Sequence, residues 1–454
     1  MTAELRRNEL SKYPAMFQRP PRRAAALTAA FVLIMMAATG LPRPGQAQFA
    51  TSPERGQAMA SFEQVWTVIR DTHWQVAPGG LDWDAIRREF EPRIAASSNL
   101  EEVRELLSEM LGRLDQSHFG IIPQLVYDDL DPASSGQHVT GIDIRMLDAQ
   151  AVVTEVVPDS PAEAAGVRPG WVLLALGSRE IVAMIEPLQE IARQRGLRLD
   201  LVLTSSLRQR LSGAANSSVP LSFLDQNGEV VDLDVPTVPP RGALVRFGNL
   251  PPMAVWYEDR RYGDVTYVRF NAFLDVPRIM PSFERSVRNC DPCAGIIIDL
   301  RGNPGGIAAM AMGMAGFLTS EQGLELGTMY MRDVELRFAV NPRRDPFEGP
   351  VAVLVDSSSA STAEIFAGGL QDLGRARIFG TTSAGAALPS VIERLPNGDG
   401  FQHAIANYVS AGGQELEGRG VRPDEIIELD QRALLNASDP VLDAALEWIE
   451  ATRP

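Results

Sequence analysis

Lysine is almost absent from this chain of 454 residues. Lysine and arginine together number 42, yet the only lysine is Lys12. Lys12 lies in an N-terminal segment that has the composition of a removable leader. The part of the chain that would remain contains no lysine, so a serine nucleophile there cannot rely on a lysine base.

Histidine and cysteine are scarce as well. An imidazole base would have to be one of four residues: His73, His118, His138 and His403. The only two cysteines lie in the segment Cys290-Asp-Pro-Cys293, and two thiols do not complete a zinc site. A thioredoxin-type redox pair follows a strand, whereas this pair precedes a predicted strand. We therefore expect a local disulfide or two free thiols.

Basic residues are fewer than acidic ones, 42 against 58. The formal net charge is -16, and residues 1–47 carry seven basic groups against two acidic ones. Removal of these residues would make the remaining chain five charges more acidic. Such a surface repels nucleic-acid phosphates and anionic lipids, so we expect neither nucleic acid nor a membrane as a partner of the mature form.

Residues 1–47 have the pattern of a signal peptide. Arg22-Arg23 precedes an apolar run over residues 24–41, which two prolines end, and Gly45-Gln-Ala47 offers small residues for cleavage. The run falls short of the ~20 residues that a transmembrane helix needs. We expect cleavage and an exported, periplasmic protein, with a retained N-terminal anchor as the alternative.

The rest of the chain divides into three regions. Residues 48–127 have apolar side chains at helical spacing, and the loop after their last predicted helix carries His118. A polar linker, 128–137, leads to a strand-rich unit at 139–235, in which we expect a helix over 181–195 and an inserted loop over 204–218. In residues 240–454, strands and helices alternate, which predicts an α/β core.

One turn of this core suits a nucleophile. The apolar strand 351–355 is followed by a short, serine-rich turn and then by a helix with Ile365, Phe366 and Leu370 on one face. A serine at the head of a helix lies beside free N–H groups, which favour developing negative charge. Ser361 is therefore the candidate nucleophile, although a serine at such a position is by default a helix cap.

Three motifs resemble the carboxy-terminal processing (tail-specific) serine peptidase family. They are Asp299-Leu-Arg-Gly-Asn-Pro-Gly-Gly306, Ser359-Ala-Ser-Thr-Ala-Glu-Ile-Phe-Ala367 and Gly420-Val-Arg-Pro-Asp424, and they occur in the family's order. The resemblance implies a crotonase-like ββα core over 240–454, an embedded PDZ-like domain over 139–235 and an N-terminal helical domain. It also implies a serine-type peptidase that uses no metal and no organic cofactor.

The chain departs from the lysine-dyad branch of that family. Where that branch has Gly-Lys-Gly after the nucleophile helix, this chain has Ala386 in place of the lysine. The sequence is more similar to the tricorn-core branch, which uses a Ser-His-Ser-Glu tetrad. This resemblance assigns the tetrad to Ser117, His118, Ser361 and Glu417.

The implied chemistry is acyl transfer. Ser361 would attack the scissile carbonyl, His118 would accept and return the proton, and Glu417 would orient the imidazole through or beside Ser117. Backbone N–H groups of Thr362 and of Gly305 or Gly306 would form the oxyanion hole. An imidazole of ordinary pKa, about 6.5, would make activity rise between about pH 6 and 7.5.

The sequence thus favours an exported serine endopeptidase that acts on peptide or protein substrates. A PDZ-like unit would bind a peptide by strand addition along residues 141–144, although the acidic Asp143 is unusual for carboxylate capture. The alternative is a catalytically inactive protein that binds peptides or small ligands on the same fold. Neither the natural substrate nor the oligomeric state follows from these residues.

Overall fold

A computed structural model describes residues 53–124, 138–185, 199–290 and 292–453. The predicted signal peptide, the whole of the predicted linker and much of the helix expected over 181–195 lie outside these residues. Within them, no helix is both long enough and apolar enough to cross a membrane.

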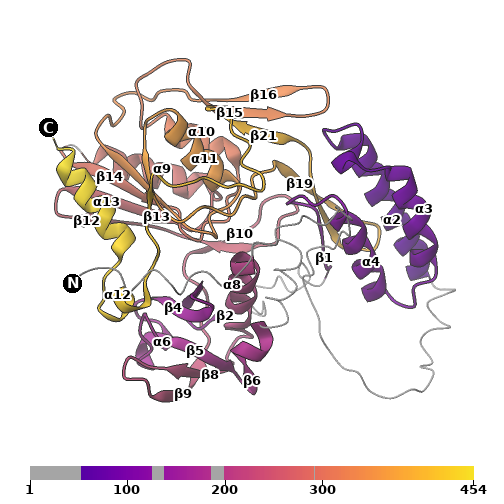
Figure 1. The fold of residues 1–454 in the computed structure, drawn as a ribbon, viewed down its shortest axis with the longest axis horizontal. Coiled ribbons are helices and arrows are strands. Elements are labelled where there is room, and N and C mark those ends of the chain that lie inside the picture. The colour runs from indigo at the N-terminus through magenta and orange to yellow at the C-terminus, as the bar shows by residue number, and fades with distance from the viewer. Residues whose placement is uncertain (1–52, 125–137, 186–198, 291, 454) are drawn as a thin grey trace, which may run out of the picture.

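Three N-terminal helices form one end of the molecule (Figure 1). They are α2 (Pro53–Thr72), α3 (Trp83–Ala95) and α4 (Leu100–Gly112), with a short turn η1 (Pro78–Gly80) between the first two. The side chain of Asn99 caps α4 by accepting the N–H of Glu102 at 2.9 Å, as a capping residue does. Their apolar faces bury residues such as Phe62 and Phe90 in a cluster that also includes Phe401 from the C-terminal half. The loop that carries His118 is therefore anchored on the core.

That anchor is a small antiparallel sheet, β1-β20-β19. Strand β1 (Gly120–Ile122) directly follows the His118 loop and pairs with β20 (Gly400–Ala404), which forms a hairpin with β19 (Ser390–Arg394). The fully buried carboxylate of Asp399 accepts two hydrogen bonds from Arg104 of α4, at 3.0 and 2.9 Å. Helices and hairpin are thus joined by both apolar packing and a buried ion pair.

The second unit contains an antiparallel sheet in the order β3-β4-β5-β8-β9 and lies against the core in Figure 1. Its strands are β3 (Ile142–Leu147), β4 (Gln150–Val156), β5 (Val172–Leu176), β8 (Ser218–Leu224) and β9 (Val230–Pro236). The short β6 (Arg179–Glu180) pairs with β5, and β2 (His138–Val139) pairs with β7 (Ser212–Gly213). The short helix α6 (Pro161–Ala164) follows β4.

The prediction of a loop over 204–218 is wrong for the first half of that segment. Helix α8 (Leu199–Arg210) occupies that part and packs against β3. Leu203, Leu207 and Leu211 are buried in the core of the unit at helical spacing. The serines between these leucines masked the helical period in the sequence.

The core is built on a six-stranded sheet in the order β12-β13-β14-β17-β18-β22. Its strands are β12 (Tyr257–Tyr262), β13 (Val265–Phe270), β14 (Gly295–Asp299), β17 (Val351–Val355), β18 (Arg377–Gly380) and β22 (Glu425–Ile426). Strand β12 is antiparallel to β13, and the others run parallel. Every residue of β14 and β17 is buried, as expected for strands covered on both faces. The predicted α/β core is confirmed.

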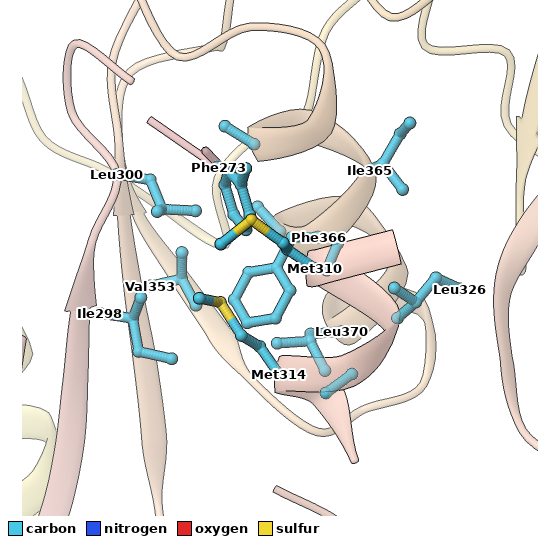
Figure 2. Close-up of a cluster of buried hydrophobic side chains, with 14 of the residues drawn as sticks. Phe273, Ile298, Leu300, Met310, Met314, Leu326, Val353, Ile365, Phe366 and Leu370 are labelled. Carbon is cyan, nitrogen blue, oxygen red and sulfur yellow. The ribbon is translucent and has the colours of Figure 1, made fainter. Parts of the chain in front are cut away.

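Helices cover the two faces of this sheet. One face packs against α9 (Val276–Arg288), α10 (Ala308–Ala315) and α11 (Thr362–Asp372), and the other against α13 (Pro440–Ala451). Figure 2 shows Phe366 and Leu370 of α11 next to Met310 and Met314 of α10, beside the strand residue Val353. This packing fixes the orientation of α11, and Ser361 immediately precedes it.

The remaining elements surround the core. A sheet in the order β16-β15-β21 contains β15 (Glu325–Tyr330), β16 (Glu335–Ala339) and β21 (Asn407–Ser410), and β10 (Ala243–Val245) pairs with β11 (Met253–Val255). Helix α12 (Gln431–Leu435) rests on the second unit, where Leu434 packs against Val152 and Val172. Cys290 and Cys293 form a disulfide just before β14.

Candidate active site

Ser361 stands at the junction of a strand, a turn and a helix. It is the N-cap residue of α11 and has φ 54° and ψ −118°. A non-glycine residue in this region is strained by about 1–3 kcal/mol, and such strain concentrates at functional sites. Its backbone N–H lies within hydrogen-bonding distance of the Ala386 carbonyl, at 2.8 Å, and of the Glu364 carboxylate, at 3.0 Å. The backbone of Ser361 is therefore held from two sides.

The glycine loop approaches Ser361 closely. A Cβ added to Gly305 would lie 2.7 Å from the Thr362 nitrogen and 2.8 Å from the Ser361 Cβ, so only glycine fits there. The N–H of Gly305 donates to the side-chain oxygen of the fully buried Asn303 at 2.9 Å. That bond corrects one part of the sequence interpretation, because a donor already engaged by Asn303 is not free to serve an oxyanion.

Two of the predicted oxyanion donors remain. Within the described residues, neither the N–H of Gly306 nor that of Thr362 donates a hydrogen bond. Thr362 is the first residue of α11, where backbone N–H groups have no partner in the helix. Gly306 is exposed, and its loop is held because the Thr362 hydroxyl donates to the Gly306 carbonyl at 2.8 Å.

Glu417, Ser117 and His118 form a continuous chain of hydrogen bonds. One carboxylate oxygen of Glu417 accepts the Ser117 hydroxyl at 2.9 Å, and the other accepts the Ser117 backbone N–H at 2.7 Å. The Ser117 Oγ lies 2.7 Å from His118 Nδ1. Since the single hydroxyl proton goes to the carboxylate, Oγ accepts from Nδ1–H. This assignment leaves Nε2 of His118 with a lone pair, which is the form that a general base needs.

The electrostatics of this chain favour a neutral imidazole. Burial lowers the pKa of His118 from its ordinary value of 6.5 to about 4. Burial also raises the pKa of Glu417, although hydrogen bonds from Ser117 and Ala387 oppose that rise. His118 has φ 61°, a left-handed conformation that is uncommon for a residue other than glycine. The His118 imidazole is thus uncharged at neutral pH.

The segment 383–387 joins Ser361 to the chain of hydrogen bonds that ends at His118. The Ala386 carbonyl lies 2.8 Å from the Ser361 N–H, and the next residue, Ala387, donates its N–H to Glu417 at 3.1 Å. Ala386 is the residue that replaces the lysine of the dyad branch. No hydrogen bond between the Ser361 and His118 side chains occurs in the described part of the chain. Such a bond is often long in enzymes without substrate and shortens in the reactive complex.

Two positioning groups were not identified from the sequence. Glu364 is fully buried beside Ser361, and Asn303 orients the glycine loop. The Ser-x-x-Glu spacing of Ser361 and Glu364, a capping-box pattern, was the available signal for the first. For Asn303 the signal was its place inside the glycine motif.

The other candidates lie elsewhere. His73 is fully buried in the helical region, and His403 is buried in strand β20. Asp299 and Arg301 form an ion pair at 2.6 Å, with Asp439 as a further partner of the arginine. No group of three or more His, Cys, Asp and Glu side chains in the described ranges is arranged to hold a metal ion.

Two segments of the chain match known protein families. Residues 264–427 match the peptidase family S41 domain. Residues 57–112 match the tricorn protease C1 domain. The chain therefore contains a peptidase family S41 domain and is a serine-type peptidase. The tricorn match covers the helices that precede the Ser117-His118 loop, which agrees with the resemblance to the tricorn-core branch.

Relatives of this chain along most of its length are named as carboxyl-terminal-processing peptidases. It is 26% identical over 400 residues to the carboxyl-terminal-processing protease of Synechocystis, and the match covers 85% of each chain. It is 23% identical over 401 residues to the chloroplastic carboxyl-terminal-processing peptidase 3 of Arabidopsis thaliana, covering 84% of this chain and 72% of the relative. The solved photosystem II D1 C-terminal processing protease has a similar fold, with a TM-score of 0.55 at 19% identity, covering 86% of this chain and all of that one.

Proposed function

We propose that this serine-type peptidase is an exported endopeptidase that cleaves peptide or protein substrates near their carboxyl ends, with Ser361 as nucleophile and His118 as base. The observation that carries this proposal is the hydrogen-bonded chain from Glu417 through Ser117 to His118. The names of the relatives support the carboxyl-terminal substrate class. The leader pattern in residues 1–47 supports export, with the periplasm as the destination.

The proposed reaction begins with proton transfer from Ser361 to His118. Nε2 of His118 takes the hydroxyl proton as Oγ attacks the scissile carbonyl, and it then gives the proton to the leaving amine. Water then hydrolyses the resulting acyl-enzyme: His118 takes a proton from the attacking water and returns it to Ser361 Oγ as the acid product leaves. Glu417, acting through the Ser117 hydroxyl, holds the Nδ1–H tautomer and stabilises the imidazolium that forms.

The oxyanion of each tetrahedral intermediate would be bound by two backbone donors. Among the residues that the structure describes, the Gly306 and Thr362 N–H groups have no acceptor, and the N-terminus of α11 adds a favourable dipole. Asn303 contributes indirectly, because its hold on Gly305 fixes the backbone that presents Gly306.

The second unit is proposed to be a PDZ-like domain beside a crotonase-like core. Strand β3 lies at an edge of its sheet and α8 packs along it, which supports strand addition of an extended peptide between them. Asp143 of β3 accepts hydrogen bonds from Arg208 of α8, at 2.6 and 3.0 Å. An incoming peptide carboxylate would therefore meet a groove already spanned by an ion pair.

The pH profile follows from the environment of His118. With the His118 pKa near 4, we expect kcat/KM to rise as pH increases through about 4 and to be nearly flat from about pH 5.5 to 8. Protonation of Glu417, whose pKa burial raises, would steepen the loss of activity on the acid side. This expectation replaces the rise between pH 6 and 7.5 that an unperturbed imidazole would give. Initial rates on one peptide between pH 3 and 9 measure it, and a midpoint near 6.5 would contradict the effect of burial.

Covalent labelling separates the proposed enzyme from an inactive binding protein. The purified mature protein should react with a fluorophosphonate probe, and mass spectrometry should locate the label on Ser361. A protein that only binds peptides would bind the same substrate in equilibrium dialysis without labelling or turnover.

A further inference from the structure

Glu364 is a buried carboxylate that the proposed mechanism does not use. Its side chain is 0% exposed, and in the described residues no arginine or histidine forms a salt bridge with it. A buried carboxylate without a cationic partner is costly unless several hydrogen bonds satisfy it. A carboxylate at this position therefore calls for an explanation beyond ordinary core packing.

Four donors surround this carboxylate, two on each oxygen. One oxygen accepts the Ser383 hydroxyl at 2.6 Å and the Gly385 N–H at 2.7 Å. The other accepts the Ala386 N–H at 2.9 Å and the Ser361 N–H at 3.0 Å. Glu364 is also the third residue of α11, where the helix dipole favours a negative charge. Every lone-pair direction of the carboxylate is thus in use.

These contacts make segment 385–387 a bridge between two carboxylates. The N–H groups of Gly385 and Ala386 point to Glu364, whereas the N–H of Ala387 points to Glu417. Glu364 also holds the nucleophile's own backbone, and Glu417 holds the histidine through Ser117. The backbone at the position of the missing lysine therefore sets the separation of Ser361 from His118.

We infer that Glu364 is a positioning residue that keeps Ser361 in register with the His118 chain and maintains its strained backbone. This inference rests on the proposed function, since it concerns the same nucleophile. Ser361 has a left-handed φ that its own residue type disfavours, so the surrounding contacts must impose it. Ser383 extends the hold, because its hydroxyl also accepts the Val421 N–H at 2.6 Å, four residues beyond Glu417.

Glu364→Gln tests the inference with little change in volume. An amide has one oxygen, so its NH2 group must face two of the four donors, and at least one backbone N–H of segment 385–386 or Ser361 loses its acceptor. We expect kcat to fall by about 10–10², with KM changed less than threefold, because substrate binding does not involve this buried group. The rate of fluorophosphonate labelling should fall by the same factor.

Two further variants separate positioning from stability. Glu258→Gln alters another largely buried carboxylate, which pairs with Arg241 at 2.8 Å and Arg260 at 3.1 Å on the outer strand β12. It should lower the thermal midpoint and leave kcat per labelled site unchanged. Glu364→Asp keeps the charge but shortens the reach. If Glu364→Gln does not fold, Glu364→Asp should still lose about tenfold in kcat at constant KM.

These experiments distinguish failure of the proposed function from failure of the positioning role of Glu364. If the wild-type protein is not labelled on Ser361, the proposed function fails. If wild type is labelled and the folded Glu364 variants show wild-type kcat and labelling rates, only the positioning role fails. A fall in kcat at unchanged KM in the Glu364 variants, absent from Glu258→Gln, supports it.

Discussion

Replacement of Ser361 by alanine is expected to lower kcat by at least about 10⁴ and to abolish labelling by the fluorophosphonate probe. Removing the nucleophile of a serine peptidase leaves only the contribution of binding and of the oxyanion donors. The hydroxyl contributes little to the buried core, so the thermal unfolding midpoint should stay within a few degrees of wild type. Turnover of a fluorogenic peptide and the labelling yield measure the effect.

The matched control for this substitution is Ser357→Ala. Ser357 lies in the same serine-rich turn, four residues before Ser361, and has no part in the proposed chemistry. It should retain wild-type labelling and turnover. Continued turnover by Ser361→Ala would remove Ser361 from the role of nucleophile.

Glu417→Gln is expected to lower kcat by about 10²–10³ with little change in KM. The amide keeps nearly the same volume but lacks the negative charge that stabilises the imidazolium of His118. Loss of the carboxylate from a Ser-His-Asp triad costs about 10⁴ in turnover. The effect should be smaller here because Glu417 acts on His118 through the Ser117 hydroxyl and not by direct contact.

The double variant tests whether these residues act as one unit. Ser117→Ala alone should lose less than Glu417→Gln, and the combined loss should be far below the product of the two. Glu415→Gln, an exposed glutamate two residues away, serves as the control and should leave kcat unchanged. Wild-type kcat in Glu417→Gln would mean that His118 is oriented by another group or is not the base.

Several elements were predictable because local patterns specify them. The spacing of apolar residues, the helix caps and the turn residues indicate these elements. They are the buried strands β14 and β17, the helices α4 and α11 and the hairpin turn at Asn397-Gly398. Helix α8 was missed because its serines resemble those of a loop. There, tertiary packing of three leucines outweighs the weak local preference.

The sequence indicated which residues belong to the candidate site, but not which hydrogen bonds connect them. The absence of lysine after Lys12 and the Ser117-His118 pair indicated a histidine-based chain with Ser361 and Glu417. The sequence could not assign the oxyanion donors, because the engagement of the Gly305 N–H by Asn303 depends on a side chain folding back onto its own loop. The role of Glu364 was hidden for the same reason, since its four donors come from segments up to 22 positions away in the chain.

By itself, the sequence determined the chemistry that is available to this peptidase: one nucleophile motif, four histidines and no lysine base. Composition and motif spacing suffice for this, because they depend on which side chains exist and on their local order. Only the tertiary structure decided the tautomer of His118, its lowered pKa and the bridge between Glu364 and Glu417. Desolvation and the choice of hydrogen-bond partner depend on which distant segments fold against each group, and that information appears only when the chain is packed.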